Sequence, residues 1–392
     1  MSDTPARFLG EPFTITDEHL NTGLRGFPVG TLRTSDVDPV EGVSYVGYPI
    51  ADLADLPCED VIYLLFHKEL PTPEQAKAFN ADLSRRAPVP KEALDCLARL
   101  PMSGHPMEWL IVGLELLGMT GKTANCDWRE DALNLVARTN TLVAAIFRIK
   151  NGWGAPIAPR TDLPFHENFA QMLGAPGAHP QLADLLRLFY VLHMDHEGGN
   201  LSTFTGKAVA SGHADQYASM AGAMAALYGP LHGRANQECL EFVKQVPTSD
   251  PDGAREYVTK HVKAGGKMPG FGHAVLRAED PRAKIQYAYG AKHFGDNKLV
   301  KTAITLREVV PAILKEHTRT KDPYPNVDAI SGSLMSAAGL SNPDFYTVLF
   351  GWSRVSGISA QIVDERAVMR DGKGVPIYRP RYLPENQSPR RR

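Results

Sequence analysis

Cysteine is scarce in this chain, and no long uncharged hydrophobic run occurs in it. The cysteines are scattered through the 392 residues without paired spacing, at Cys58, Cys96, Cys126 and Cys239. Such a distribution is typical of reduced thiols and not of a disulfide framework. The longest apolar run, residues 109–119, contains Glu115 and is too short to cross a bilayer. We therefore expect reduced thiols in a cytosol-like compartment and no membrane span.

An excess of charge of either sign is also missing. The chain carries 42 Lys and Arg against 44 Asp and Glu, which gives a formal net charge of −2. This balance provides no whole-molecule field that would attract nucleic acid or an acidic membrane. The only run of like charge, residues 390–392, is expected to be a solvated end. The first fifteen residues contain neither an apolar signal core nor an Arg-rich amphipathic helix, so no targeting segment is predicted.

Most of the sequence has a helical hydrophobic period with recognisable ends. Hydrophobic residues make up 43% and charged residues 22%, and 392 residues suffice for a large core and usually two structural units. Thr72, Pro73 and Gln75 have the spacing of a capping box at the start of one helix. The segment after Pro106 is apolar almost all round and is expected to be buried. The predicted helical segments are 70–88, 105–119, 127–152, 180–196, 213–229 and 251–266.

Strand signals are confined to residues 30–50, where alternation between turn residues predicts a small β-meander. No internal repeat, flexible linker or low-complexity block interrupts the chain. The fold class predicted from these patterns is all-α, with a minor N-terminal β element.

Two histidines three residues apart, His193 and His196, raise the question of a metal site. The glycines at 198 and 199 break the helix that a helical pair of ligands would need for support. A metal would also need a third ligand and a fixed outer shell, and no nearby segment repeats the pattern. The sequence therefore does not predict a metal centre here, and the role of the pair stays open at this point.

Three further stretches interrupt the helical pattern with glycine and proline, at 228–238, 265–282 and 324–332. Each contains an ionisable residue at an element boundary, namely His232, His273 and Asp328. A single histidine beside glycine is more often a turn or core residue than a catalyst, and an aspartate after Pro-Asn-Val is usually a cap. Taken one at a time, these residues do not define a function.

Taken together, the stretches resemble the citrate synthase family. HMDHEGGN, GPLHGRANQE, PGFGHAVLRAEDPR, PNVDAISG and LFGWSRVSG are similar to five signature stretches of that family, in the same order and at matching spacing. The likeness is greatest to the si-type, mitochondrial-like branch and extends from about Thr14 to Arg381. It implies a citrate synthase-like two-domain helical fold. The large domain would comprise 1–233 and 340–392, and a smaller mobile domain would comprise 234–339.

The resemblance implies condensation of acetyl-CoA with oxaloacetate, followed by hydrolysis of citryl-CoA to citrate and CoA. Removing the weakly acidic methyl proton requires a base on one side and a hydrogen-bond donor at the thioester carbonyl on the other. By resemblance Asp328 is the base and His232 the donor, which should be neutral, as a helix N-terminus would favour. His273 would polarise the oxaloacetate ketone and protonate the new alkoxide.

Binding residues are also implied by the resemblance. The two carboxylates of oxaloacetate call for rigid bidentate donors, and Arg282, Arg354 and Arg379 match the family's arginines. Arg282 follows Asp280-Pro281, which we interpret as an N-cap and first turn. His196 matches the oxaloacetate-binding histidine, and His193 is interpreted as structural. The implied coenzyme contacts are Arg25, Lys267, Met268, Gly270 and Arg277, with Lys122 a weaker candidate. No metal and no cofactor is implied, since the coenzyme A thioester is a substrate.

The C-terminal segment bears on how the chain assembles. The Pro-rich segment 374–389 suits an extended arm, and the resemblance implies a homodimer in which Arg379 enters the partner's site. We expect a cytoplasmic enzyme, or a mitochondrial matrix enzyme with its transit peptide removed, and no nucleic-acid or membrane partner. One alternative is 2-methylcitrate synthase, since one methylene in an apolar pocket is worth only about 1–3 kcal/mol. Another is an inactive relative that serves in assembly, against which the complete set of catalytic residues argues.

Overall fold

The structure is a computed structural model that describes residues 14–383. The chain divides into two compact units, Met1–Thr31 and Leu32–Arg392. In the first unit, the described residues form one short 3-10 helix, η1 (Asp17–Asn21), which buries none of its residues. Among the described residues, all the buried ones and the other helices and strands belong to the second unit.

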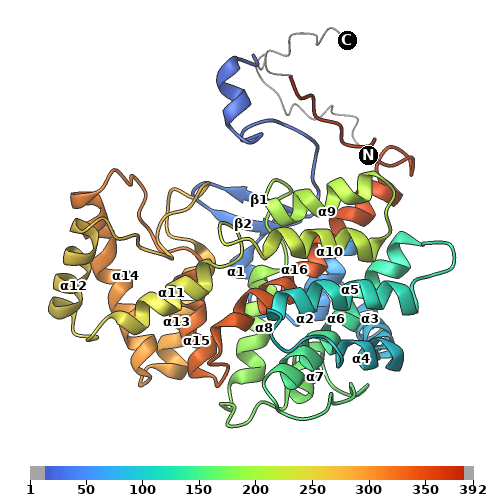
Figure 1. Ribbon diagram of the computed structural model, residues 1–392, viewed down its shortest axis with the longest axis horizontal. Coiled ribbons are helices and arrows are strands. Elements are labelled where there is room, and N and C mark those ends of the chain that lie inside the picture. The colour runs from blue at the N-terminus through green and yellow to red at the C-terminus, as the bar shows by residue number, and fades with distance from the viewer. Residues whose placement is uncertain (1–13, 384–392) are drawn as a thin grey trace, which may run out of the picture. The chain divides into compact units, whose positions relative to one another are not determined.

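Helices make up most of the second unit (Figure 1), which confirms the predicted all-α class. They are α1 (Ile50–Leu53), α2 (Cys58–His67), α3 (Pro73–Arg86), α4 (Lys91–Leu97), α5 (Pro106–Gly121), α6 (Trp128–Lys150), α7 (Phe165–Leu173), α8 (Leu182–His193), α9 (Leu201–Ser211), α10 (Gln216–Leu227), α11 (Ala235–Gln245), α12 (Pro251–Lys263), α13 (Pro281–Phe294), α14 (Lys298–His317), α15 (Asp328–Ala337) and α16 (Tyr346–Val363). Short turns η2 (Pro343–Phe345) and η3 (Asp364–Val368) flank α16, and η3 is π-helical.

The six predicted helical segments are all helices, and their local start signals act as expected. At α3 the Thr72 hydroxyl accepts a hydrogen bond from Gln75 N at 3.3 Å, and the Gln75 side chain accepts one from Thr72 N at 2.8 Å. This reciprocal pair satisfies donors that the first turn of a helix leaves open. Asp127 likewise caps α6 through its carboxylate. These boundaries follow from side chains within four residues of the helix start.

The expectation that residues 105–119 are buried all round is only partly correct. His105 caps α5, and the inner face is buried, yet Val112 is 39% exposed and Met119 is 76% exposed. The rest of this chain therefore covers only one side of α5, and apolar side chains on the other side face solvent. An exposed apolar side of this kind is a candidate contact surface for a second chain.

The predicted meander is a three-stranded antiparallel sheet in the order β1-β2-β3. Its strands are β1 (Ser35–Asp38), β2 (Gly42–Tyr45) and β3 (Tyr48–Pro49). Ser35 pairs with Tyr45 at one end of the β1–β2 ladder, and Asp38 pairs with Gly42 at the other. Gly42 and Gly47 both have a φ of +84°, which glycine adopts without a Cβ penalty. The sheet packs on α1, and α1 in turn packs on α13.

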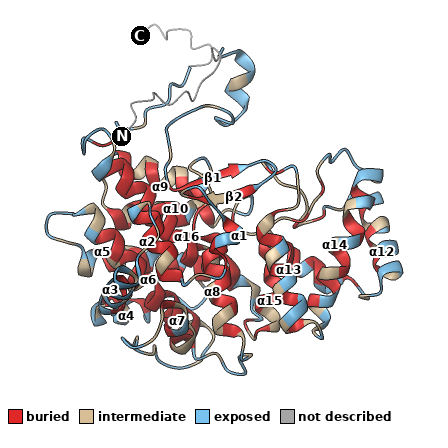
Figure 2. Ribbon diagram, turned by 180° about the vertical axis from the view of Figure 1, so that it is seen from behind, coloured by how far each residue is buried: buried red, intermediate tan, exposed pale blue. Residues whose placement is uncertain are grey.

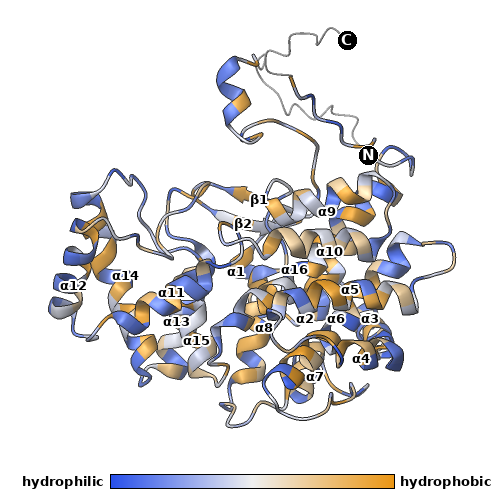
Figure 3. Cartoon of the chain, viewed as in Figure 1, coloured by the Kyte–Doolittle hydropathy of each residue, from blue (hydrophilic) through white to orange (hydrophobic). Residues whose placement is uncertain are grey.

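The core is centred on α16, whose residues are all buried except Phe350. Helices α2, α5, α6, α8, α9, α10 and α11 contact it, and Figure 2 shows the buried residues concentrated in this region. Figure 3 shows that hydrophobic residues dominate here, whereas α12 is largely hydrophilic. Helix α12 buries only Ala254, Val258 and Val262, which form one stripe with a spacing of four.

Helices α11 to α15 pack mainly on one another, through the pairs α11–α15, α12–α14, α13–α15 and α14–α15. The start of α13, the start of α15, the end of α8 and the middle of α16 carry the residues of the candidate site. In the part of the chain that the structure describes, no helix is both long and apolar enough to cross a membrane.

Candidate active site

His196 lies in the irregular segment that follows α8, and its backbone is fixed on both sides. Asp195 Oδ1 accepts hydrogen bonds from His196 N at 3.0 Å and from Gln361 Nε2 at 2.8 Å. The Asn200 side chain donates to His196 O at 2.8 Å. The His196 ring is 5.5 Å from the ring of His273, centroid to centroid. Burial, with Arg282 and Arg354 nearby, lowers the pKa of His196 well below its usual value, so this histidine is neutral.

His193, the other histidine of the opening motif, is a packed core residue. Its Nδ1 is 2.8 Å from Phe189 O, one helical turn earlier, and therefore carries the ring proton. Its ring stacks on Phe189, and burial lowers its pKa to about 3. His193 O accepts a hydrogen bond from Arg354 Nε. Within the described residues no cluster of His, Cys, Asp or Glu could hold a metal ion.

His273 is held in one tautomer by the backbone of the next residues. Its Nδ1 lies 3.0 Å from both Val275 N and Leu276 N. Because a backbone N–H can only donate, Nδ1 must be the acceptor, and the proton of the neutral ring is on Nε2. Burial is the main cause of its lowered pKa, with Arg282 adding to it and Asp280 opposing it. His273 is therefore a neutral ring with a fixed Nε2–H donor.

His232 has the opposite tautomer, fixed by the N-terminus of α9. The backbone N–H of Ser202, in the first turn of α9, donates to His232 Nε2 at 3.1 Å, and the Ser202 hydroxyl is 3.0 Å from the same atom. Burial lowers the pKa of His232 to about 4, and the charge of Arg354 adds to the effect. The ring is neutral with its proton on Nδ1. The helix N-terminus that contacts His232 is that of α9.

Asp328 is the first residue of α15 and is partly accessible. Its backbone N–H donates to Asn326 Oδ1 at 3.0 Å. Burial raises the pKa of Asp328 to about 6, although Arg282 and Arg354 act in the opposite direction. Burial disfavours the charged form, so the carboxylate is more basic than an ordinary aspartate and is still ionised at neutral pH.

Arg282 and Asp280 form a buried pair at the start of α13. Arg282 Nε lies 3.0 Å from Asp280 Oδ1 and Nη2 lies 2.7 Å from Oδ2. Asp280 also caps α13 by accepting from Arg282 N at 2.9 Å, which confirms the predicted N-cap and first turn. The side chains are 2% and 0% exposed. One edge of the guanidinium is therefore occupied by Asp280, and Nη1 has no partner in residues 14–383.

Arg354 lies in the middle of α16 and is 2% exposed. Its Nε donates to His193 O at 3.0 Å, and its guanidinium lies 4.7 Å from the centre of the Phe350 ring. Burial lowers its pKa to about 10, which leaves it charged at neutral pH. In residues 14–383 neither terminal nitrogen has a hydrogen-bond partner and no carboxylate pairs with it. Asp195 and Asp328 act on its charge only from beyond ion-pair distance. A buried cation without a direct ion pair is costly, so Arg354 indicates an anionic ligand.

The residues predicted for coenzyme binding lie mostly in the segment before His273. Phe271 bridges to Pro325, Gly270 O accepts from Asn326 N at 2.9 Å, and Gly272 N donates to Tyr324 O at 2.8 Å. A Cβ at Gly270 would lie 2.8 Å from Ala329 Cα, so only glycine fits there. The exposed Lys267 and the buried Met268 begin this segment. Backbone hydrogen bonds thus join the segment before His273 directly to the segment that carries Asp328.

The four remaining predicted residues are exposed. Arg379 is exposed and makes no hydrogen bond or ion pair with the described residues. Arg25 belongs to the first unit and is exposed. Arg277 is about half exposed and lies 3.6 Å from Asp322. Lys122 pairs with Asp215 at 2.9 Å. The binding roles of these four residues stay predictions.

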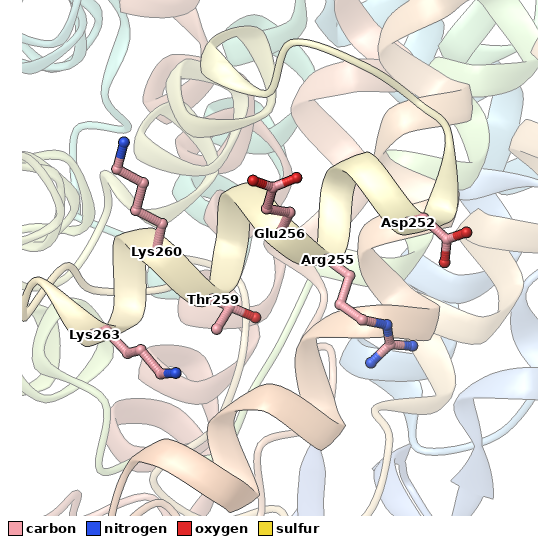
Figure 4. Close-up of a pocket in the computed structure, with 6 residues that line it drawn as sticks. All are labelled: Asp252, Arg255, Glu256, Thr259, Lys260 and Lys263. Atoms are coloured by element: carbon pink, nitrogen blue, oxygen red, sulfur yellow. The ribbon is translucent and has the colours of Figure 1, made fainter.

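Ser202 and Asn200 were missed by sequence reasoning, because nothing in the sequence places α9 against His232. An open hollow of about 550 Å³ lies elsewhere, along α12 (Figure 4). Its lining side chains all come from this one helix: Asp252, Arg255, Glu256, Thr259, Lys260 and Lys263. None belongs to the site, and none is a buried polar group that would need a ligand.

Two neutral histidines with opposite fixed tautomers, a carboxylate of raised pKa and two buried arginines define an enzyme that performs acid–base chemistry on an anionic substrate. The family described as "Citrate synthase, C-terminal domain" matches residues 23–381. A mitochondrial citrate synthase of Daucus carota is 36% identical, over 94% of this chain and 82% of the carrot protein. A mitochondrial 2-methylcitrate synthase of Yarrowia lipolytica is 36% identical over 92% of this chain and 82% of its own.

Among solved structures, the citrate synthase of Thermotoga maritima superposes with a TM-score of 0.79 at 29% identity, covering 94% of this chain and 96% of that one. The chain therefore belongs to the citrate synthase family.

Proposed function

We propose that this protein condenses acetyl-CoA with oxaloacetate and hydrolyses the citryl-CoA intermediate to citrate and CoA. The observation that carries the proposal is the buried Arg354, whose guanidinium forms no ion pair within residues 14–383 and which lies among Arg282, His196, His273 and Asp328. A carboxylate of a small dicarboxylate supplies the ion-pair partner. The neutral histidines and the basic carboxylate supply the proton transfers that this reaction needs.

Oxaloacetate is held by its carboxylates. The two terminal nitrogens of Arg354 and Nη1 of Arg282 are the donors not already committed to protein groups. His196 is neutral and its Nε2 is buried without a partner among the described residues, so it is available to a ligand. The Nε2–H of His273 then hydrogen-bonds the ketone oxygen, which makes the ketone carbon more electrophilic.

Enolisation is shared between Asp328 and His232. Asp328 accepts a proton from the thioester methyl, while His232 donates a hydrogen bond from Nδ1 to the thioester oxygen. The carbon of the hydrogen-bonded enolate attacks the polarised ketone, one carbon–carbon bond forms as the C=O π bond breaks, and the alkoxide takes the Nε2 proton of His273. Water then adds to the thioester carbonyl and returns a proton to His273, the carbon–sulfur bond breaks, and the leaving thiolate takes the proton held by Asp328, so that CoA and citrate leave and both residues are restored.

We further propose that the protein functions as a homodimer in which each chain has two domains that move relative to one another. Residues 1–233 and 340–392 form the large domain, and 234–339 the small domain. The mutual packing of α11 to α15 supports this division. The exposed apolar residues Val112 and Met119 of α5 support a partner surface. In the dimer Arg379 reaches the partner's oxaloacetate, while Arg25, Lys267, Met268, Gly270 and Arg277 bind coenzyme A.

The compartment belongs to the proposal as well. Low cysteine content fits a reducing compartment, either the cytoplasm or the mitochondrial matrix. The mitochondrial relatives support the matrix alternative.

Propionyl-CoA is the second candidate substrate, because a 2-methylcitrate synthase is as similar to this chain as citrate synthases are. The deciding experiment measures CoA release by a coupled thiol assay with oxaloacetate and either acetyl-CoA or propionyl-CoA, with an acyl-free control. We expect a higher kcat/KM with acetyl-CoA. A preference for propionyl-CoA would establish the second function, and release with neither thioester would contradict both.

A further inference from the structure

The β1–β2 hairpin contacts both halves of the oxaloacetate site. At one end of its ladder, the Tyr45 hydroxyl accepts a hydrogen bond from Asp195 N at 3.1 Å and donates one to Val191 O at 3.1 Å. Beside it, the Ser35 hydroxyl accepts from Glu197 N at 2.9 Å. Ser35 and Tyr45 are cross-strand partners. This end of the hairpin therefore holds the backbone on both sides of His196.

The other end of the same ladder holds the segment that carries His273 and Arg282. In the β-turn, Pro39 O accepts a hydrogen bond from Arg277 N at 2.7 Å. A Cβ at Gly42 would lie 2.5 Å from Cδ of Pro281, the residue before Arg282, so the glycine backbone is packed directly against the start of α13. The Asp38 carboxylate accepts from Val40 N and Glu41 N and so fixes the turn.

No hydrogen bond in residues 14–383 joins segment 195–200 directly to segment 273–282. The hairpin is therefore the short hydrogen-bonded connection between them, and its four-residue strands span about 10 Å at about 3.3 Å per residue. An antiparallel ladder is stiff along its strands, so it transmits position better than a loop of that length.

We propose that the β1–β2 hairpin is a spacer that sets the position of His273 and Arg282 relative to His196 in the closed arrangement of the proposed domains, with Gly42 and Pro39 as positioning residues for oxaloacetate. The inference rests on the proposed function, because it assumes that both segments bind the same substrate. It predicts that a change at the turn, which touches no substrate, alters oxaloacetate affinity. A displacement of about 1 Å at a reacting geometry can cost about a hundredfold in rate.

Gly42 and Gly47 provide a matched pair for the test. Gly42 is the first residue of β2 and Gly47 lies in the turn before β3, and both have a φ of +84°, so alanine causes similar backbone strain at each. A Cβ at Gly47 meets no atom within 4 Å, whereas a Cβ at Gly42 collides with Pro281. Any difference between Gly42→Ala and Gly47→Ala in substrate binding is therefore due to the contact with α13.

The experiment measures KM for oxaloacetate, kcat and thermal unfolding of the wild type and both variants. We expect a loss of Tm in both variants, and a larger one in Gly42→Ala because its Cβ also collides with Pro281. Gly42→Ala should raise the KM for oxaloacetate at least tenfold, and Gly47→Ala should leave it within about twofold. Removing the colliding ring in Gly42→Ala/Pro281→Ala should restore the KM of Pro281→Ala alone. Equal KM values for Gly42→Ala and Gly47→Ala would overturn the inference.

A second pair tests the opposite end of the hairpin if Gly42→Ala does not fold. Tyr45 and Tyr346 are both buried, and each donates its hydroxyl to a backbone carbonyl. Tyr45→Phe should raise the KM for oxaloacetate at least fivefold, and Tyr346→Phe should not. Equal values would count against the spacer. A wild type that forms no citrate and does not bind oxaloacetate would instead refute the proposed function.

Discussion

The backbone N–H of Ser202 donates a hydrogen bond to Nε2 of His232 across 3.1 Å. This contact joins the first turn of α9 to a ring thirty residues later and leaves the imidazole proton on Nδ1. The positive end of the helix dipole opposes protonation of the ring, as burial does. A neutral imidazole donor matches a forming enol better than an imidazolium would.

The first prediction separates the backbone of Ser202 from its hydroxyl. Ser202→Ala keeps the N–H that fixes the tautomer, so kcat should fall less than about fivefold. His232→Ala removes the donor to the thioester oxygen, and kcat should fall about 10²–10³-fold, the usual cost of one such donor. Steady-state kinetics at saturating oxaloacetate measure both. If Ser202→Ala were as inactive as His232→Ala, the hydroxyl would be the essential group.

The second prediction concerns the pH dependence of the reaction. Asp328 must be ionised to accept a proton, and its pKa is raised to about 6. The value of kcat/KM for acetyl-CoA should therefore fall tenfold per pH unit below about pH 6. His232 should add no transition above pH 5, because its pKa is lowered to about 4. A pH profile that stays flat down to pH 5 would be incompatible with Asp328 as the base.

Asp328→Asn provides the third prediction. Turnover should be lost, while oxaloacetate affinity measured by calorimetry should stay within a few-fold, because Asp328 acts on the thioester methyl. Loss of binding in proportion to turnover would make Asp328 a structural anchor.

The same substitution, Asp328→Asn, should raise the stability of the folded protein although it abolishes turnover. The pKa of Asp328 in the folded protein, about 6, exceeds the ordinary aspartate value of 3.8, so the native state binds the proton more tightly than the unfolded state does. The contribution of this proton binding to the free energy of unfolding is complete below about pH 4 and is lost as the pH rises through 6. The neutral asparagine avoids this loss, so at pH 7 the variant should gain about 1–3 kcal/mol in unfolding free energy. At pH 4 denaturant titration should show no gain.

The parts of the structure that sequence could predict depend on nearby residues. Thr72 and Gln75 cap α3, Asp127 caps α6, and Asp280 caps α13, each through a bond that spans at most three residues. The resemblance named His232, His273 and Asp328, and the structure brings Arg354 and Arg282 near Asp328. The sequence did not individually predict α1, α2, α4, α7, α9, α11, α14, α15 and α16; among them, α14 contains Pro311 and α16 is buried except at Phe350.

The remaining features depend on contacts between distant segments. The sequence indicated Asp280 only as a helix cap, whereas in the structure its carboxylate also pairs with one edge of the Arg282 guanidinium. Ser202 fixes the tautomer of His232 from another element, and Gly42 touches Pro281 across more than two hundred residues. No period or motif in one segment encodes such a partner. The apolar sequence of α5 likewise does not distinguish burial within this chain from contact with a second chain, and one side of the helix is exposed here.

The fourth prediction is an order of binding. Oxaloacetate would contact His196 and Arg354 of the proposed large domain, and His273 and Arg282 of the small one, so its binding should favour domain closure. An oxaloacetate analogue should then raise acetyl-CoA affinity about tenfold or more, within the usual range of coupling energies. Calorimetric titration with and without the analogue measures this. Unchanged affinity would show that the acetyl-CoA site exists before closure.

The last prediction tests whether Arg379 acts across the dimer. It is exposed, lies in a segment without helix or strand and has no partner in residues 14–383, as expected for an arm that completes another chain's site. Arg379→Ala and Asp328→Asn should each be nearly inactive alone.

Refolded together in equal amounts, these variants should form about half hybrid dimers, each with one complete site of two, because a homodimer has two-fold symmetry. About a quarter of wild-type activity should return if the chains exchange freely and the two sites work independently. Differently tagged chains confirm that hybrids form, and refolding each variant alone controls for spontaneous recovery. Hybrids without activity would mean that Arg379 serves its own chain or does not bind substrate.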